Sequence, residues 1–348
     1  MSIHMRLTIS RRKASFAGKQ VFAGLPALKG AVEMKKSGIT ICVVAGVLLL
    51  ASSAFPQGEK EGQGQIIVTV LPKHEADQAP GVSAQDMTVK VNGKDSKVTN
   101  LQALKGAKDP VELVVLIDGS ARTSLGRQLD DISQFVKSLP PNIRATIGYM
   151  QNGVSALSGP LTTDHETVLR GLHIPVGSAG TNGSPYFCLS DLAKRWPSQD
   201  REARREVLMV TDGVDEYNRR FDPDDPYVQA AVADSVRAHL VVYSIYWRNQ
   251  GRADNTQYEN NAGQNLLQII TQATGGRSFW EGTGNPVSFQ PFLEELTRRF
   301  QNQYELSFVV PMKGKPEVEQ IKLKFKAPGS EVDAPQQVFV SRPGVAQD

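Results

Sequence analysis

Three segments of the chain are apolar runs in which hydrophobic residues do not alternate with polar ones. They cover residues 111–118 (VELVVLID), 205–212 (REVLMVTD) and 239–247 (HLVVYSIYW). Strands that are buried on both faces of a parallel sheet have this pattern, whereas half-exposed strands alternate. The three segments are therefore predicted to be central strands of one parallel sheet.

In three other segments the apolar residues recur with a period near 3.6, which predicts helices over residues 125–136, 186–196 and 226–238. The start of the last helix is supported by Asp225 before Pro226. Aspartate caps free backbone N–H groups, and proline fits the first helical turn. Helices thus separate the predicted strands.

A hairpin is predicted where residues 145–150 (ATIGYM) and 154–159 (VSALSG) flank a short turn. It would give the sheet one antiparallel edge. Strands that alternate with helices in this way indicate an α/β fold with a doubly wound, mostly parallel, Rossmann-like sheet. In such sheets ligands bind at the carboxyl ends of the strands, where the chain order reverses.

Two short β regions flank this α/β segment. Residues 64–106 contain three strand-like runs, with Asn92-Gly93 as a hairpin signal, and are predicted to form a small β unit. Residues 304–348 form a second β segment, in which residues 321–326 alternate apolar side chains with lysines. Because the first unit is too short to bury much of a core alone, we expect the two to pack together.

The formal net charge of +3 is concentrated near the N-terminus. Residues 1–54 hold eight of the 39 basic residues and one of the 36 acidic residues, so the remainder has 31 basic and 35 acidic groups. Residues 55–348 thus carry a net negative charge, which would repel the phosphates of a nucleic acid. We therefore expect no nucleic-acid partner.

Residues 34–54 have the three parts of a secretory signal peptide: two lysines, an apolar run, and small residues before a cleavage site near Ala54. The alternative is an uncleaved membrane anchor, because the uncharged stretch is close to the ~20 residues that span a bilayer. Residues 1–33 match neither a signal nor a domain, so translation is expected to start at Met34, and residues 55–63 are expected to be a linker. The sequence therefore predicts an exported protein that is periplasmic, secreted or associated with the cell envelope.

Acidic and hydroxyl side chains stand at the ends of two predicted strands. The first strand ends at Asp118, with Ser120 two residues later, and the second ends at Asp212. Two carboxylates at neighbouring strand ends repel each other unless a cation or a basic group lies between them. A few hard oxygen ligands completed by water suit Mg²⁺ or Mn²⁺. The alternative is that Asp118 and Ser120 only cap the helix that follows.

These residues resemble the motif of the von Willebrand factor type A domain, whose metal-ion-dependent adhesion site is written DxSxS, a distant Thr, and a distant Asp in a TDG turn. The first element stands here as residues 118–122 (DGSAR) and the last as residues 211–213 (TDG). The resemblance covers residues 107–303. The flanking β regions resemble those of bacterial exported proteins called VWFA-related, best known from Acidobacteria. The resemblance implies an open α/β domain that binds a protein partner through a divalent metal.

The middle element of the motif is expected just before a helix. Ser184, followed by Pro-Tyr-Phe, matches the family's Thr before an apolar helix start, and Thr181 is the alternative. The resemblance thus implies a metal site made of Asp118, Ser120, Ser184 (or Thr181) and Asp212.

Arg122 departs from this motif, because the family has a second serine there that bonds the metal directly. The site loses one ligand and gains a fixed positive charge. In one interpretation Arg122 points into solvent and water completes a weaker metal site. In the other, its guanidinium lies between Asp118 and Asp212 and replaces the cation.

Two functions follow from these interpretations. The first is a non-enzymatic protein-binding domain whose degenerate adhesion site recognises a protein or peptide, through a carboxylate that completes the metal shell. The second is a metal-independent structural scaffold of a cell-envelope assembly. The sequence contains no G-x-S-x-G motif, and the order of its Ser, His and Asp residues indicates no catalytic triad, so we predict no enzymatic activity.

Overall fold

The computed structural model of the chain describes residues 60–74, 81–106, 108–121, 125–175, 183–248, 256–282, 284–312, 314–326 and 328–342. All of them belong to one compact unit, Pro56–Asp348. The predicted N-terminal extension, the signal peptide and the start of the linker lie outside these residues. No helix within the described ranges is long and apolar enough to cross a membrane.

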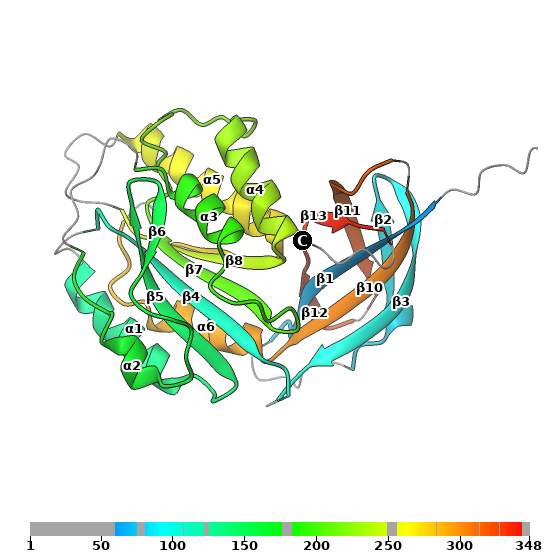
Figure 1. Cartoon of the computed structure of the whole chain (residues 1–348), viewed down its shortest axis with the longest axis horizontal. Helices are drawn as coiled ribbons and strands as arrows, with labels where there is room; N and C mark the ends of the chain where they lie inside the picture. The colour runs from blue at the N-terminus through cyan, green and yellow to red at the C-terminus, as the bar shows by residue number, and fades with distance from the viewer. Residues whose placement is uncertain are drawn as a thin grey trace, which may run out of the picture. The chain divides into compact units, whose positions relative to one another are not determined.

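A six-stranded sheet lies at the centre of the α/β part, with the strand order β6-β5-β4-β7-β8-β9 (Figure 1). Its strands are β4 (Val111–Asp118), β5 (Ile143–Gln151), β6 (Val154–Leu157), β7 (Arg204–Thr211), β8 (Leu240–Tyr246) and β9 (Ser278–Phe279). The pairs β4–β5, β4–β7, β7–β8 and β8–β9 are parallel, and β6 pairs antiparallel with β5. The three predicted central strands and the predicted hairpin are confirmed.

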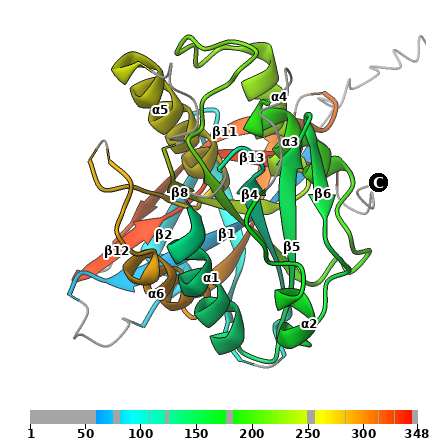
Figure 2. The ribbon, with the colours of Figure 1, turned by 90° about the vertical axis from the view of Figure 1, so that its left-hand side faces the viewer.

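Helices cover both faces of this sheet. They are α1 (Gly126–Ser138), α2 (His165–Leu169), α3 (Pro185–Lys194), α4 (Pro226–Arg237), α5 (Gln257–Thr274) and α6 (Gln290–Phe300). One core cluster joins the sheet to α1, α2 and α6, and a second joins it to α3, α4 and α5. Figure 1 shows the two sets of helices on opposite faces of the sheet. Figure 2 shows α1 and α6 side by side on their face. The three predicted helices are confirmed as α1, α3 and α4, and the Asp225 carboxylate accepts hydrogen bonds from the Tyr227 and Val228 N–H groups at 2.8 and 3.3 Å.

The strands before and after the α/β segment form one seven-stranded sheet in the order β12-β1-β10-β3-β2-β11-β13. Its strands are β1 (Lys60–Pro72), β2 (Met87–Val91), β3 (Lys94–Leu104), β10 (Gln303–Met312), β11 (Glu317–Phe325), β12 (Ser330–Asp333) and β13 (Gln337–Val340). Neighbouring strands are antiparallel, and β1, from the N-terminal side, pairs along its length with β10, from the C-terminal side. A bridge between Gln63 and Ser341 also brings β1 next to the end of β13.

The linker predicted for residues 55–63 is wrong over its last four residues, because Lys60–Pro72 is a single strand. Gly62 and Gly64 occupy its buried positions, and a Cβ atom there would lie 2.6 Å from Val340 and 2.5 Å from Phe308, respectively. The two glycines leave room for the Val340 and Phe308 side chains against the backbone of β1. The period-2 pattern is thus present, but glycine takes the place of the apolar residue by which a strand is recognised.

The two sheets meet at a buried polar network. The Arg204 guanidinium donates to the Phe300 carbonyl at 3.1 Å and to the side-chain oxygen of Gln303. The Gln303 amide in turn donates to the Tyr243 hydroxyl at 3.2 Å. Glu206 is fully buried beside this network, and neither of its carboxyl oxygens meets a hydrogen-bond partner with good geometry among the described residues. Burial raises the pKa of Glu206 to about 8, although Arg204 and Gln303 oppose the shift.

This raised pKa predicts a pH-dependent stability that Glu206→Gln abolishes. Folded Glu206 keeps its proton up to about pH 8, whereas the unfolded chain releases it near pH 4.5. The folded state therefore binds more protons between these values, and its stability falls as the pH rises through that window. We expect the free energy of unfolding to fall by about 4 kcal/mol more in the wild type than in Glu206→Gln between pH 5 and pH 8.5. Urea unfolding at both pH values measures the difference, and parallel pH profiles would contradict it.

Candidate functional site

The candidate residues stand where the order of strands reverses. From β4 the chain continues to β5 on one side, and later returns to β7 on the other side of β4. Asp118 is the last residue of β4, and Asp212 directly follows β7. Both aspartates therefore lie at the carboxyl ends of adjacent parallel strands, the place where open α/β sheets bind ligands.

Asp118 is held by contacts from both strand ends. One carboxylate oxygen accepts hydrogen bonds from the Ser120 backbone N–H at 2.8 Å and from the Ser120 hydroxyl at 2.5 Å. The other accepts from the Thr211 hydroxyl at 2.9 Å. These bonds fix the Asp118 side chain and join the loop after β4 to the turn after β7.

Ser184 is the N-cap residue of α3, with Pro185 in the first helical turn. Its side chain is fully buried, and its hydroxyl meets no hydrogen-bond partner with good geometry among the described residues. The hydroxyl nevertheless lies close enough to Asp215 to lower the pKa of that carboxyl. Buried polar atoms without a well-aligned partner are uncommon, so the Asp215 carboxyl is the nearest group that can pair with this hydroxyl.

Asp215 is a residue of this region that the sequence motif did not indicate. It is 2% exposed, and one of its carboxylate oxygens accepts from the Tyr217 N–H at 2.8 Å while the other meets no partner in the described part of the chain. Burial raises its pKa, and hydrogen bonds from Tyr217, Asn218 and Ser184 oppose that shift. The sequence could have indicated Asp215 only through its position, three residues after Asp212 in the same loop.

The first turn of α3 is fastened to the turn after β7. The Tyr186 hydroxyl donates to the Gly213 carbonyl at 2.7 Å. Burial raises the pKa of Tyr186 well above its usual value, and the nearby charges of Asp215 and Asp212 raise it further. Tyr186 therefore brings α3, and with it Ser184, to the same end of the sheet as Asp212 and Asp215.

Asp212 is 1% exposed, and one of its carboxylate oxygens accepts from the Val214 N–H at 3.0 Å. Its turn depends on Gly213, which has φ +67°, in the left-handed region that favours glycine. A Cβ atom on Gly263 of α5 would lie 2.2 Å from the Asp212 carbonyl oxygen. The turn therefore rests directly on the backbone of α5.

The donor set suits a small divalent cation. Asp118, Ser120, Ser184 and Asp212 offer carboxylate and hydroxyl oxygens, the ligands that Mg²⁺ and Mn²⁺ prefer. The Ser184 hydroxyl oxygen is fully buried beside the Asp215 carboxyl, where it could contribute a lone pair to a cation. Among the described residues no group of three or more His, Cys, Asp or Glu side chains is arranged to hold a metal. Any metal at this end of the sheet would therefore depend on the two hydroxyls as well as the carboxylates.

Two residues named from the sequence, Arg122 and Thr181, lie outside the described part of the chain. The structure thus brings the Asp118 loop, Ser184 and the Asp212 turn to one end of the sheet. It does not place the residue that departs from the motif.

Three aromatic side chains, two of them exposed, lie close to this end of the sheet. Phe187 of α3 makes edge-to-face contacts with Tyr217 and Tyr227, with ring centroids 5.8 and 4.8 Å away, and the two tyrosines contact each other at 5.2 Å. Tyr217 is 58% exposed and Tyr227 is 40% exposed. Tyr217 is two residues from Asp215, so this aromatic surface (Phe187, Tyr217 and Tyr227) adjoins the candidate site.

The sequence matches no protein-family model and no curated protein. Solved structures resemble it in part. The conserved hypothetical protein BatB from Bacteroides thetaiotaomicron aligns at 15% identity and TM-score 0.41, over 54% of this chain and 96% of its own. An aerotolerance-related membrane protein from Bacteroides fragilis aligns at 14% identity and TM-score 0.39, over 55% of this chain and 98% of its own. The pilus adhesin SpaC from Lactobacillus rhamnosus GG, in an open conformation, aligns at 10% identity and TM-score 0.40, over 78% of this chain and 49% of its own. Resemblances at this level assign neither a family nor a function.

Proposed function

We propose that this chain is an exported, non-enzymatic binding domain of the von Willebrand factor type A class, with a doubly wound sheet. Its partner is a protein or peptide bound at the carboxyl ends of β4 and β7. The observation that carries the proposal is the hydrogen bond from Thr211 to Asp118, which joins the first and last elements of the motif at the reversal of strand order. We also propose that the protein is located in the cell envelope. The seven-stranded sheet would then flank the binding domain there.

Asp118, Ser120, Ser184 and Asp212 would hold the cation. Ser120 and Ser184 offer hydroxyl oxygens, and the buried carboxylates of Asp212 and Asp215 supply negative charge nearby. A bound Mg²⁺ or Mn²⁺ would present an open coordination position to a carboxylate of the partner. The residues of this chain fix the geometry through the hydrogen bonds to Asp118 and the contact of Tyr186 with Gly213.

The aromatic surface favours a protein partner. Tyrosine and phenylalanine are enriched at the centres of protein interfaces, where they bury large areas at a low cost in side-chain entropy. An acidic side chain of the partner at the cation, with an apolar residue beside it on Tyr217 and Tyr227, would match this arrangement of charge and aromatic surface.

Titration of Mg²⁺ and Mn²⁺ into the purified protein, by calorimetry and thermal unfolding, tests the proposal. A ligand that binds only the folded state stabilises it by about 2.7 kcal/mol at a hundredfold excess over Kd. We expect this gain in the wild type and its loss in Asp212→Ala, with Asp222→Ala, an exposed acid elsewhere in the same loop, as a control that keeps the gain.

Arg122→Ser, tested in parallel, separates the proposal from a metal-independent scaffold. Metal binding by the wild type supports the binding domain. No binding by the wild type together with binding by Arg122→Ser would contradict it, and would mean that Arg122 takes the place of the cation. No binding by either protein would refute the metal site altogether.

A further inference from the structure

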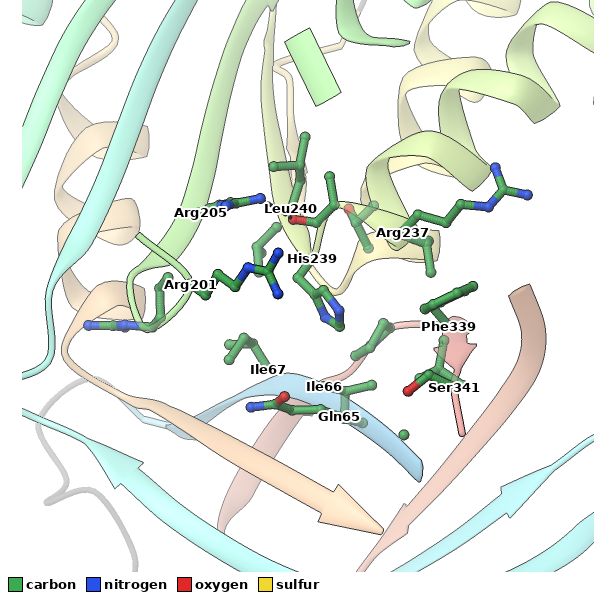
Figure 3. Close-up of a pocket in the computed structure, with 18 of the residues that line it drawn as sticks. Gln65, Ile66, Ile67, Arg201, Arg205, Arg237, His239, Leu240, Phe339 and Ser341 are labelled. Atoms are coloured by element: carbon green, nitrogen blue, oxygen red, sulfur yellow. Dashed lines mark hydrogen bonds between the residues drawn. The ribbon is translucent and has the colours of Figure 1, made fainter. Parts of the chain in front are cut away.

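A second candidate site lies at the opposite ends of the strands. A cavity of about 990 Å³ is lined by the first residues of β7 and β8, by β1 and by β13. Figure 3 shows Arg201, Arg205 and His239 on one side of this cavity and Gln65, Ile66 and Ile67 of β1 on the other. The volume is within the range of cavities that hold small ligands.

The walls of this cavity are fixed relative to each other. The Gln336 N–H donates to the Gln272 carbonyl of α5 at 2.9 Å, and the Arg204 guanidinium donates to the Phe300 carbonyl at 3.1 Å. The Gln336 bond connects the α/β part with the region of the seven-stranded sheet, and so does a second bond from the Arg204 guanidinium to the side-chain oxygen of Gln303 in β10. The cavity is therefore a preformed feature of the compact unit.

Positive charge exceeds negative charge along the lining. Six Lys and Arg residues line the cavity, against the three acids Glu202, Asp234 and Glu305. Two of the cations share one acid, because Lys194 and Arg237 both pair with Asp234, at 2.8 and 3.3 Å. A surplus of positive charge is left for a ligand.

Arg201 and Arg205 carry most of this surplus. Among the described residues Arg205 donates only to the backbone carbonyls of Ala238 and Asp200, at 3.3 and 3.5 Å. Its guanidinium lies 5.7 Å from the centre of the Trp196 ring. Arg201 is exposed and has no hydrogen-bond or ion-pair partner within the described ranges. Burial lowers the pKa of Arg205, and the nearby positive charge of Arg201 lowers it further, although the charges of Glu112 and Asp200 oppose the shift. Two like charges this close are stabilised by an anion between them.

The opposite side of the cavity carries apolar side chains among polar ones such as Gln65 and Ser341. Ile67 and Phe339 line it and are only partly buried. A ligand that fits both sides therefore has a charged group and an apolar body. Guanidinium groups bind phosphate oxygens through paired hydrogen bonds, and a phosphate monoester carries enough negative charge to balance two arginines.

We propose that this cavity binds a phosphate monoester with an apolar body, its phosphate between Arg201 and Arg205 and its body against Ile67 and Phe339. The site is independent of the metal site, since it lies at the other ends of the strands and uses none of its residues. The phosphate belongs either to a soluble compound or to the head group of a lipid.

Calorimetric titration of the whole protein with phenyl phosphate, in EDTA so that no metal takes part, tests this proposal. We expect binding that is weakened tenfold or more in Arg201→Gln, because a lost charge-assisted hydrogen bond has about this effect. Arg220→Gln, an exposed arginine in the loop after β7 that does not line the cavity, is the matched control and should bind as the wild type does. Since Arg201 is exposed, its substitution should leave the thermal unfolding midpoint unchanged.

Further probes define the ligand. Inorganic phosphate, which lacks the apolar body, and benzoate, which lacks the phosphate, should both bind more weakly than phenyl phosphate. Short-chain phosphatidic acid in place of phenyl phosphate distinguishes a lipid head group, by tighter binding, from a soluble compound. The proposal would be overturned if the wild type did not bind phenyl phosphate, or if Arg201→Gln bound it as tightly as the wild type. It would also be overturned if Arg201→Gln and Arg220→Gln lost the same amount of affinity.

Discussion

Replacing Arg299 by methionine is expected to lower the free energy of unfolding by about 3 kcal/mol. Arg299 lies on α6 and is 0% exposed. Its guanidinium pairs with Glu295 at 2.9 Å and with Asp333 of β12 at 2.6 Å. Among the described residues, Glu295 and Asp333 would keep only their pairs with Arg298 and Arg277, respectively. Loss of a fully buried guanidinium from two ion pairs costs more than loss of an exposed pair. Urea unfolding of the two proteins measures the change.

Arg237→Met is the matched control for this prediction. Arg237 is also on a helix and pairs with Asp234 at 3.3 Å, but its side chain is 52% exposed. Exposed pairs contribute less than about 1 kcal/mol, so the control should unfold almost as the wild type does. If Arg299→Met and Arg237→Met lost the same free energy of unfolding, the buried pair between α6 and β12 would not contribute more than an exposed pair.

Gly263→Ala is expected to destabilise the protein by about 2 kcal/mol and to weaken metal binding with it. In most helix interiors this substitution is stabilising, because alanine has the higher helix propensity. Here the new Cβ would lie 2.2 Å from the Asp212 carbonyl oxygen and 2.9 Å from Gly213, both of them backbone atoms. Backbone cannot move aside as a flexible side chain can, so the turn that carries Asp212 has to shift.

Gly126→Ala provides the contrast. Gly126 begins α1, and a Cβ atom there meets nothing within 4 Å. We expect a small gain in stability and unchanged metal binding. A Gly263→Ala protein that keeps both its stability and its affinity for metal would show that the contact between α5 and the Asp212 turn is not tight.

The buried strands were predictable because their hydrophobic residues leave no polar face. β4 is buried from Val111 to Ile117, as its sequence predicts. β12 (SEVD) was not predictable, because four mostly polar residues carry no hydrophobic period, and only pairing with β1 makes them a strand. The start of α5 is likewise polar, and its available signal was the capping box between Thr256 and Glu259.

The candidate site was predictable only where local sequence determines position. Asp118 and Asp212 follow apolar strands, so their place at the strand ends could be deduced from the sequence, and Asn92-Gly93 forms its hairpin turn with positive φ at both residues. The contact of Gly263 with the Asp212 turn joins residues about fifty positions apart and leaves no local pattern. The burial of Asp215 also depends on tertiary packing, which the sequence does not reveal.

The most direct test of the metal site is diffraction from crystals soaked in Mn²⁺, at a concentration that saturates the titration. We predict an anomalous difference peak bounded by the side chains of Ser120, Ser184 and Asp212. A peak elsewhere, or no peak at the carboxyl ends of β4 and β7, would contradict the claim that this end of the sheet binds a divalent cation.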